Sequence, residues 1–321
     1  MSHEQFTLHS ARQFMENMVA EGLLARNVGL DVGPAEVVSG SFSKIMEIAE
    51  QGLPLARLLD ASDMLFHAEG PGAAHGMPWI GALTWLLESV QTNIRKLSAA
   101  VLDLWGADGR ALVRHLDLRV PGVVPGSLWV GVKLVAPQAD LLPQDTALME
   151  RLGEHLGSLP ALTRFVGDEG LRDGIEEVAP DPALRDAQLA ALYRFAPTGR
   201  RGIHTLELSA RGGARASLSQ RERVVLHEAI ARPNRALSKD GVFIGEVREA
   251  DLDKTRIHLR NVPDVGTLRC VLPELPADKA AAILGKPARV QGRYLADAQG
   301  RPRLMFVERI EPHQVQGHIG G

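Results

Sequence analysis

Between positions 241 and 312, apolar side chains recur at every second position within several short segments. This spacing is typical of β-strands that bury one face. Three such segments come first, and they are GVFIGEVREAD at 241–251, KTRIHLRNV at 254–262 and TLRCVLP at 267–273. PADKAAAIL then predicts a short helix, with Pro276 at its start and Gly285 after its end. The stretch 286–312 predicts two further strands joined by a polar turn.

Three strands, a helix and two strands, in that order, resemble the OB-fold, a five-stranded Greek-key barrel. The resemblance implies a closed sheet without exposed edges. GEVREADLDKTRIHLRN and VQGRYLADAQGRPRLMFVERIEP are also similar to the ends of some uncharacterised bacterial two-domain proteins. Some of those proteins are encoded beside toxin–antitoxin or defence genes. That second resemblance implies a component of a bacterial defence or toxin-control complex, and it supplies no catalytic residues.

The first two thirds of the chain mix helical and strand patterns. Apolar residues recur at steps of three and four over 80–105, which predicts a long helix. RALVRHLDLRV at 110–120 and LWVGVKLVAP at 128–137 flank a turn and predict a hairpin that this helix covers. We therefore expect an α+β or α/β N-terminal body, followed by a C-terminal five-stranded OB-like β-barrel.

The remaining segments are assigned by the same patterns. Helices are predicted at 9–25, 41–50, 54–64, 145–157 and 181–194, a short strand and turn at 27–38, a loop at 67–78 and a strand at 203–210. Ser219 and Glu222 stand three positions apart, which predicts a capping box at the start of a further helix. The expected divisions are an α+β body at 1–214, a connecting helix at 215–237, the barrel at 238–312 and a tail at 313–321.

Composition indicates the cellular compartment in which we expect the protein. The 321 residues include a single cysteine, Cys270, which excludes an internal disulfide and fits a reducing cytoplasm. The N-terminus has no apolar core like that of a signal peptide, and the run 77–87 is too short to cross a bilayer. We therefore expect a cytoplasmic protein without membrane contact.

A row of cations on the predicted barrel is the leading candidate for a binding face. Alternation directs Ile257 and Leu259 inward, and it directs the neighbouring cations to the other face. OB-folds bind oligonucleotides on their second and third strands, with cations for phosphates and aromatic rings for stacking. The candidate residues for nucleic acid or a protein partner are Arg256, His258, Arg260, Arg269, Arg289, Arg293 and Tyr294. Aromatic residues are scarce in this segment, so a plain solvated sheet face is the competing interpretation.

Candidate catalytic and metal-binding residues form no complete motif. His67, Glu69 and His75 lie close together in HAEGPGAAHGMP, but their spacing matches no known metal motif. The segment 218–230 lacks both the second histidine of HExxH and a second helix for a helix-turn-helix. Cys270 alternates with inward leucines, which favours a core position over a nucleophile.

These observations leave three hypotheses about function. The first is a non-catalytic cytoplasmic binding or assembly protein, without a cofactor or metal, that associates with a protein partner or with itself. The second is a nucleic-acid-binding module built on the cationic row. The third is an enzyme with a site in the N-terminal body near His67, His75 or His115.

Overall fold

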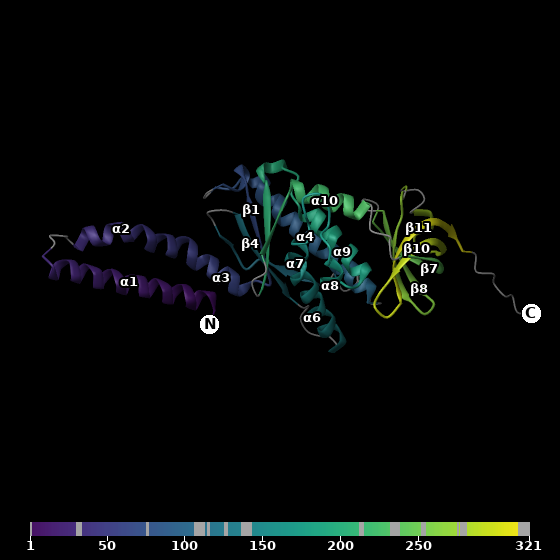
Figure 1. Ribbon diagram of the computed structural model, residues 1–321, viewed down its shortest axis with the longest axis horizontal. Coiled ribbons are helices and arrows are strands. Elements are labelled where there is room, and N and C mark those ends of the chain that lie inside the picture. Colours follow the sequence, from purple (N-terminus) through teal and green to yellow (C-terminus); the bar gives the residue numbers. More distant parts are fainter. Residues whose placement is uncertain are drawn as a thin grey trace, which may run out of the picture.

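A computed structural model shows three successive parts along the chain (Figure 1). A helical arm comes first, a mixed helix-and-sheet body follows, and a small barrel comes last. The described residues are 2–29, 34–74, 77–105, 116–124, 128–135, 143–211, 215–231, 238–251, 255–274 and 281–313, together with 113 and 276. The chain is therefore α+β with a C-terminal barrel, as its patterns predict.

The arm consists of two helices that lie side by side and project from the body (Figure 1). They are α1 (His3–Asn27) and α2 (Pro34–Glu47). Ser2 and Gln5 form a capping box at the start of α1. The carboxylate of Asp60 accepts hydrogen bonds from the first two amides of α1, those of His3 and Glu4, at 2.9 Å each. Asp60 belongs to α3 (Leu53–Ala61), so the first turn of α1 is fixed to the base of the arm.

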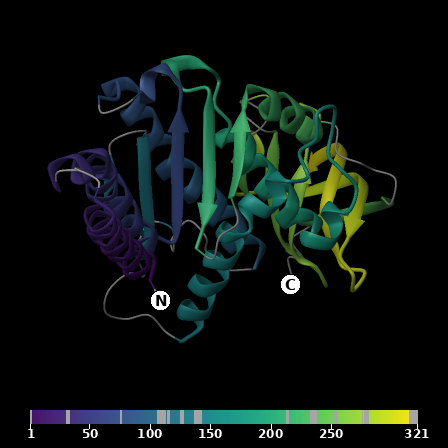
Figure 2. The same ribbon diagram turned by 60° about the vertical axis from the view of Figure 1, so that its left-hand side comes forward.

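The body is built around an antiparallel sheet with the order β2-β4-β1-β5-β6. Figure 2 shows its strands side by side, with the arm to one side and the barrel to the other. The strands are β1 (Met64–Glu69), β2 (Asp117–Arg119), β3 (Val123–Val124, paired with β4), β4 (Leu128–Val135), β5 (Thr205–Ala210) and β6 (Arg215–Ser219).

Helices cover one face of this sheet and enclose the main core. Phe66, Val130 and Leu208 extend from the sheet into one apolar cluster with Leu86 and Leu192 from the helices. The helices are α4 (Ile80–Leu104), α6 (Pro143–Gly157), α7 (Leu159–Thr163), α8 (Ile175–Val178), α9 (Pro182–Phe195) and α10 (Gln220–Ala231). α4, α6 and α9 confirm the helices predicted from apolar spacing. On the other face, Leu58 of α3 packs against Leu65 and Val124.

Three predictions for the arm and the body are wrong. The segment predicted as a loop at 67–78 contains the end of β1, because His67 to Glu69 are strand residues at the centre of the sheet. The segment predicted as strand and turn at 27–38 is helical from Asn27 backwards and from Pro34 onwards. Residues 215–219 form the edge strand β6, and only then does α10 begin. Ser219 stands at the start of α10 as predicted, and half of the capping box is present: its amide donates to Glu222 at 2.7 Å, while its hydroxyl accepts from the Arg221 amide at 3.1 Å.

The barrel confirms the predicted OB-like topology. Its strands are β7 (Lys239–Asp251), β8 (Arg256–Val262), β9 (Gly266–Val271), β10 (Pro287–Ala296) and β11 (Pro302–Pro312). They close in the order β10-β11-β9-β8-β7, with β11 parallel to β9 and the other pairs antiparallel. Ile257, Leu259, Leu268 and Cys270 point into its apolar core, as alternation predicts.

No helix within the described part of the chain combines the length and the apolar character needed to cross a bilayer.

Candidate functional site

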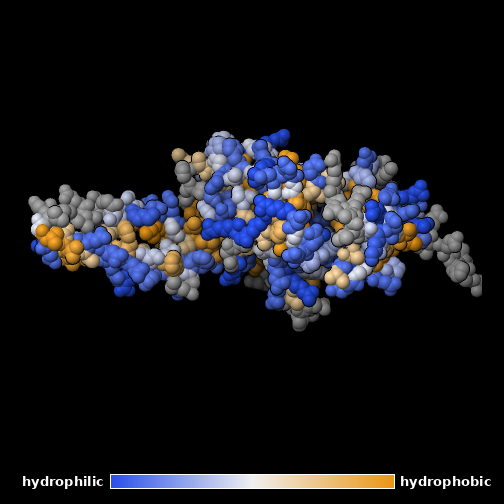
Figure 3. Space-filling view, in the orientation of Figure 1, coloured by the Kyte–Doolittle hydropathy of each residue, from blue (hydrophilic) through white to orange (hydrophobic). Residues whose placement is uncertain are grey.

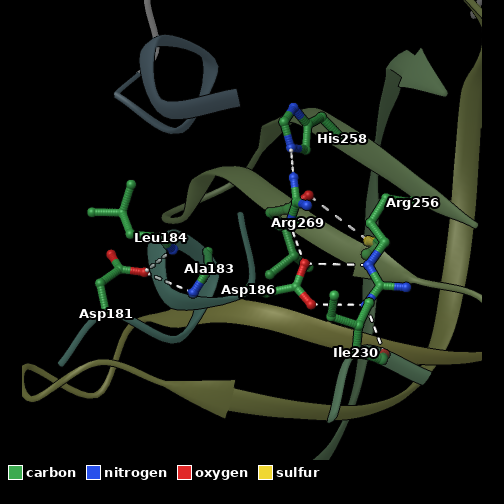
Figure 4. Close-up of polar contacts among 10 residues, drawn as sticks. Asp181, Ala183, Leu184, Asp186, Ile230, Arg256, His258 and Arg269 are labelled. Atoms are coloured by element: carbon green, nitrogen blue, oxygen red, sulfur yellow. Dashed lines mark hydrogen bonds and ion pairs between the residues drawn. The ribbon is translucent and has the colours of Figure 1, made fainter. Parts of the chain in front are cut away.

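The cationic row on β8 and β9 faces the body instead of solvent. Arg256, His258 and Arg269 expose only 4, 2 and 6% of their surface. α4 and α9 of the body contact this side of the barrel, and both supply carboxylates to it. Figure 4 shows those of α9, Asp181 and Asp186. The interpretation of a solvated sheet face is therefore wrong for these three residues. The alternation itself is right, because Ile257 lies in the barrel core on the other side of the same strand.

Asp186 of α9 is the centre of this interface. Its two carboxylate oxygens accept from Arg256 Nη2 at 2.8 Å, from Arg256 Nε at 3.2 Å and from Arg269 Nε at 2.7 Å (Figure 4). Arg256 Nη2 also donates to the Ile230 carbonyl in the last turn of α10, at 2.9 Å. Burial alone would raise the pKa of Asp186, but the charges and hydrogen bonds of the two guanidinium groups hold it well below its usual range.

Asp103, near the end of α4, forms the second half of the network. It pairs with Arg260, and one of its oxygens lies 3.3 Å from His258 Nδ1. His258 Nε2 lies 2.9 Å from Arg269 Nη1. A guanidinium only donates, so Nε2 accepts and the ring proton sits on Nδ1, where it is donated to Asp103. His258 thus links the Asp103 and Asp186 groups.

A third carboxylate, Asp181, extends the contact to β11. It accepts from Arg303 Nε at 2.7 Å and also caps α9 through the amides of Ala183 and Leu184. Arg303 Nη2 reaches the carbonyl of Leu104 at the end of α4. Cations at helix C-termini and carboxylates at a helix N-terminus are both favourable for the helix dipole. Body and barrel are therefore joined by three carboxylates, each of which binds more than one partner.

The other predicted binding residues do not join this cluster. Arg289 is exposed on β10. Arg293 is partly buried and donates to the Ser238 carbonyl at 3.4 Å. Tyr294 packs edge-on against Phe243, with ring centroids 5.3 Å apart, beside the barrel core. The seven residues therefore do not form one surface, and their role in binding nucleic acid stays a prediction.

His67 lies on the sheet face opposite the main core. Its ring stacks on Trp129 with centroids 3.9 Å apart, and its Nδ1 is 3.8 Å from Glu69. His75 and His115 lie outside the described residues. Among the residues that are described, no three His, Cys, Asp or Glu side chains gather closely enough to hold a metal ion. Cys270 is fully buried in the barrel, and burial raises the pKa of its thiol.

Acid is expected to weaken the fold in two steps. Burial lowers the pKa of His67 and His155, so the neutral form of each is favoured in the folded chain. Their stabilisation is complete above the unfolded pKa of about 6.5 and is lost as the pH falls below it. The contribution of Asp186, whose pKa is also lowered, is lost only below about pH 4.

Denaturant unfolding measured from about pH 8 to about pH 5 tests the first step. The free energy of unfolding should fall with pH, and a His67→Gln, His155→Gln double variant should flatten that slope. An unchanged slope in the double variant would contradict the assignment to these two histidines.

The arm carries an exposed apolar surface. The apolar spacing over 9–25 predicts a helix but not that one of its sides is exposed. α1 contains no buried residue, although it runs for 25 residues. Among the described side chains of α1 and α2, the exposed large apolar residues are Phe6, Leu8, Met15, Val19, Leu23 and Leu24 on α1 and Phe42 and Met46 on α2. Figure 3 shows apolar residues among polar ones along the arm, with a group near its outer end. Soluble proteins rarely leave so many large apolar side chains together in water unless they bind something there.

Sequence comparison with known proteins provides no function for this chain. No protein-family model matches this chain, and no curated protein matches it significantly in sequence.

Proposed function

We propose that this protein is a non-catalytic cytoplasmic assembly protein that binds other protein molecules through its arm. The observation that carries the proposal is the exposed apolar surface of α1, a long helix with no buried side chain of its own. A helix of this kind is stable when a partner covers its apolar face. The bacterial resemblance of the barrel sequence adds a defence or toxin-control complex as the setting.

The body covers the face of the barrel on which OB-folds bind oligonucleotides. Asp186, Asp103 and Asp181 pair with cations of the barrel, so the face that OB-folds use for oligonucleotides is covered by the chain itself. A ligand at that face would have to displace carboxylates already paired with buried arginines, at a cost of several kcal/mol, roughly that of stranding a buried charge. This observation favours the arm over the cationic row as the binding surface.

Charges placed on the arm test this proposal. The variant Met15→Asp, Val19→Asp puts two carboxylates on the exposed apolar side of α1. Its control, Gln13→Asp, Asn17→Asp, adds the same charge to exposed positions on the other side of the helix. Tagged full-length chains are co-expressed with the untagged chain in the source cells and captured, and co-purifying polypeptides are quantified.

The wild type and the control should retain a stoichiometric polypeptide, and the Met15→Asp, Val19→Asp variant should lose at least nine tenths of it, equivalent to about 1.4 kcal/mol or more. Retention of the same polypeptide by all three chains would contradict the proposal, as would a wild type that retains nothing.

A further inference from the structure

A cavity lies between α9 of the body and the last two strands of the barrel. It has a volume of about 110 Å³. Leu189 of α9 lines it from the body, and Leu295 of β10 and Leu304 of β11 line it from the barrel. It shares Ile175 and Ala229 with a wider cleft of about 330 Å³, whose wall includes exposed side chains of α8 and α10. A molecule in the cavity would therefore touch both parts of the chain.

Arg185 brings a positive charge into the wall of this cavity. Only 14% of its side chain is exposed, and its Nη1 donates to the Ala179 carbonyl at 2.6 Å. The carboxylate that pairs with it, that of Glu176, lies 3.9 Å from Nη2 and belongs to a side chain that is 56% exposed. Asp186 also lines the cavity, but its oxygens already accept from the buried arginines of the barrel.

The guanidinium of Arg185 is incompletely compensated for its burial. A guanidinium carries five N–H donors, and burying a charge without acceptors is costly. Within the described part of the chain, Arg185 makes one short hydrogen bond and one long ion pair. Burial is the largest influence on the pKa of Arg185, and it lowers that pKa. A carboxylate in the cavity would supply two acceptors in the geometry that a guanidinium binds best.

We propose that this cavity binds a small carboxylic acid. Its carboxylate pairs with Arg185, and its short apolar chain lies against Leu189, Leu295 and Leu304. Apolar cavities of about 150 Å³ accept a benzene ring, so a volume of about 110 Å³ suits a chain of roughly four carbon atoms. Apolar walls with a few polar groups that orient the ligand are the usual composition of a ligand pocket. The inference concerns a different part of the chain from the arm and does not depend on the proposed function.

The position of the cavity connects this ligand to the junction of body and barrel. Arg185 and Leu189 belong to the body, whereas Leu295 and Leu304 belong to the barrel, so the site is complete only when the two parts are packed together. A ligand that needs both walls binds the joined form alone and stabilises it by mass action.

Isothermal titration calorimetry of the full-length protein with sodium pentanoate tests the proposal. The expected dissociation constant is on the order of 1 mM, as for a ligand of about seven non-hydrogen atoms. Pentan-1-ol has the apolar chain without the charge, and inorganic phosphate has the charge without the chain. Each of these two should bind at least tenfold more weakly than pentanoate.

Two variants with matched controls locate the ligand. Arg185→Gln should weaken pentanoate binding at least tenfold, whereas Arg172→Gln, which removes an exposed charge from the wider cleft, should weaken it less than threefold. Ala229 is half-buried, and Ala229→Leu fills the space between cavity and cleft and should abolish binding. Ala231→Leu makes the same change at an exposed position of α10 and should leave binding unchanged.

Each other outcome overturns the inference. Equal binding of pentan-1-ol and pentanoate would remove the role of the Arg185 charge, and equal binding of phosphate would remove the role of the apolar wall. Undiminished binding by both Arg185→Gln and Ala229→Leu would place the ligand elsewhere on the chain. A wild type that binds no pentanoate at roughly twenty times the expected dissociation constant would show that the cavity is not a carboxylate site.

Discussion

Replacement of Asp186 by alanine is expected to lower the free energy of unfolding by about 3–5 kcal/mol. The change strands Arg256 and Arg269 in an interface where they expose only 4 and 6% of their surface. Buried charges without a partner are strongly unfavourable, so the interface must open or admit water. Guanidinium chloride unfolding followed by tryptophan fluorescence and circular dichroism measures the loss.

A surface ion pair is the matched control for this prediction. Glu16→Ala removes a carboxylate from the exposed Arg12–Glu16 pair on α1 and should cost only about 0.3–0.5 kcal/mol. Replacing the whole group, as Asp186→Leu, Arg256→Met, Arg269→Met, should recover most of the stability lost in Asp186→Ala, because no unpaired charge remains. Equal losses in Asp186→Ala and Glu16→Ala would show that the network does not hold the two parts together.

Replacement of Phe66 by alanine is expected to cost about 3–5 kcal/mol through the cavity it leaves in the body. Phe66 has no exposed surface, lies on the central strand β1, and has its ring centroid 5.3 Å from that of Phe195. Phe6→Ala on the arm, where the ring is 59% exposed, removes the same atoms and should cost less than about 1 kcal/mol in a monomeric sample. Comparable losses at the two positions, measured by the same unfolding experiment, would contradict the assignment of β1 to the core.

The barrel strands and α4 could be predicted because the spacing of apolar residues within each element indicates its structure. Each barrel strand has one face in an apolar core, so alternation reveals it, and the order of elements then fixes the topology. α4 buries a regular stripe that includes Leu86, Val90 and Ile94. Both signals are local periodicities, which sequence reasoning detects well.

The missed elements lack such a period. β1 is buried along Met64 to Ala68 on both faces, so no alternation marks it, and the glycines after Glu69 favoured a loop. Pro34 suggested a turn, although proline is also favoured in the first turn of a helix, which is where it stands. β6 is short, and its polar residues were assigned to the start of the helix that Ser219 caps.

The interface could be predicted only in part. Alternation assigned Arg256 and His258 to one face of β8, but it does not say whether that face meets water or another part of the chain. Their carboxylate partners lie 70 and 155 positions earlier. One signal was available, because Asp103 interrupts the apolar end of α4 and such a residue is usually paired when buried. The exposed apolar side of α1 was not recognised either. Apolar spacing predicts the helix, but it does not show which side of α1 lacks a partner.

Light scattering on the full-length protein as captured from the source cells tests the central claim most directly. The account predicts a complex heavier than one chain for the wild type and for Gln13→Asp, Asn17→Asp, and the mass of a single chain for Met15→Asp, Val19→Asp at the same concentration. A wild type with the mass of one chain, or a heavier complex that persists in the Met15→Asp, Val19→Asp variant, would contradict assembly through the exposed apolar side of α1.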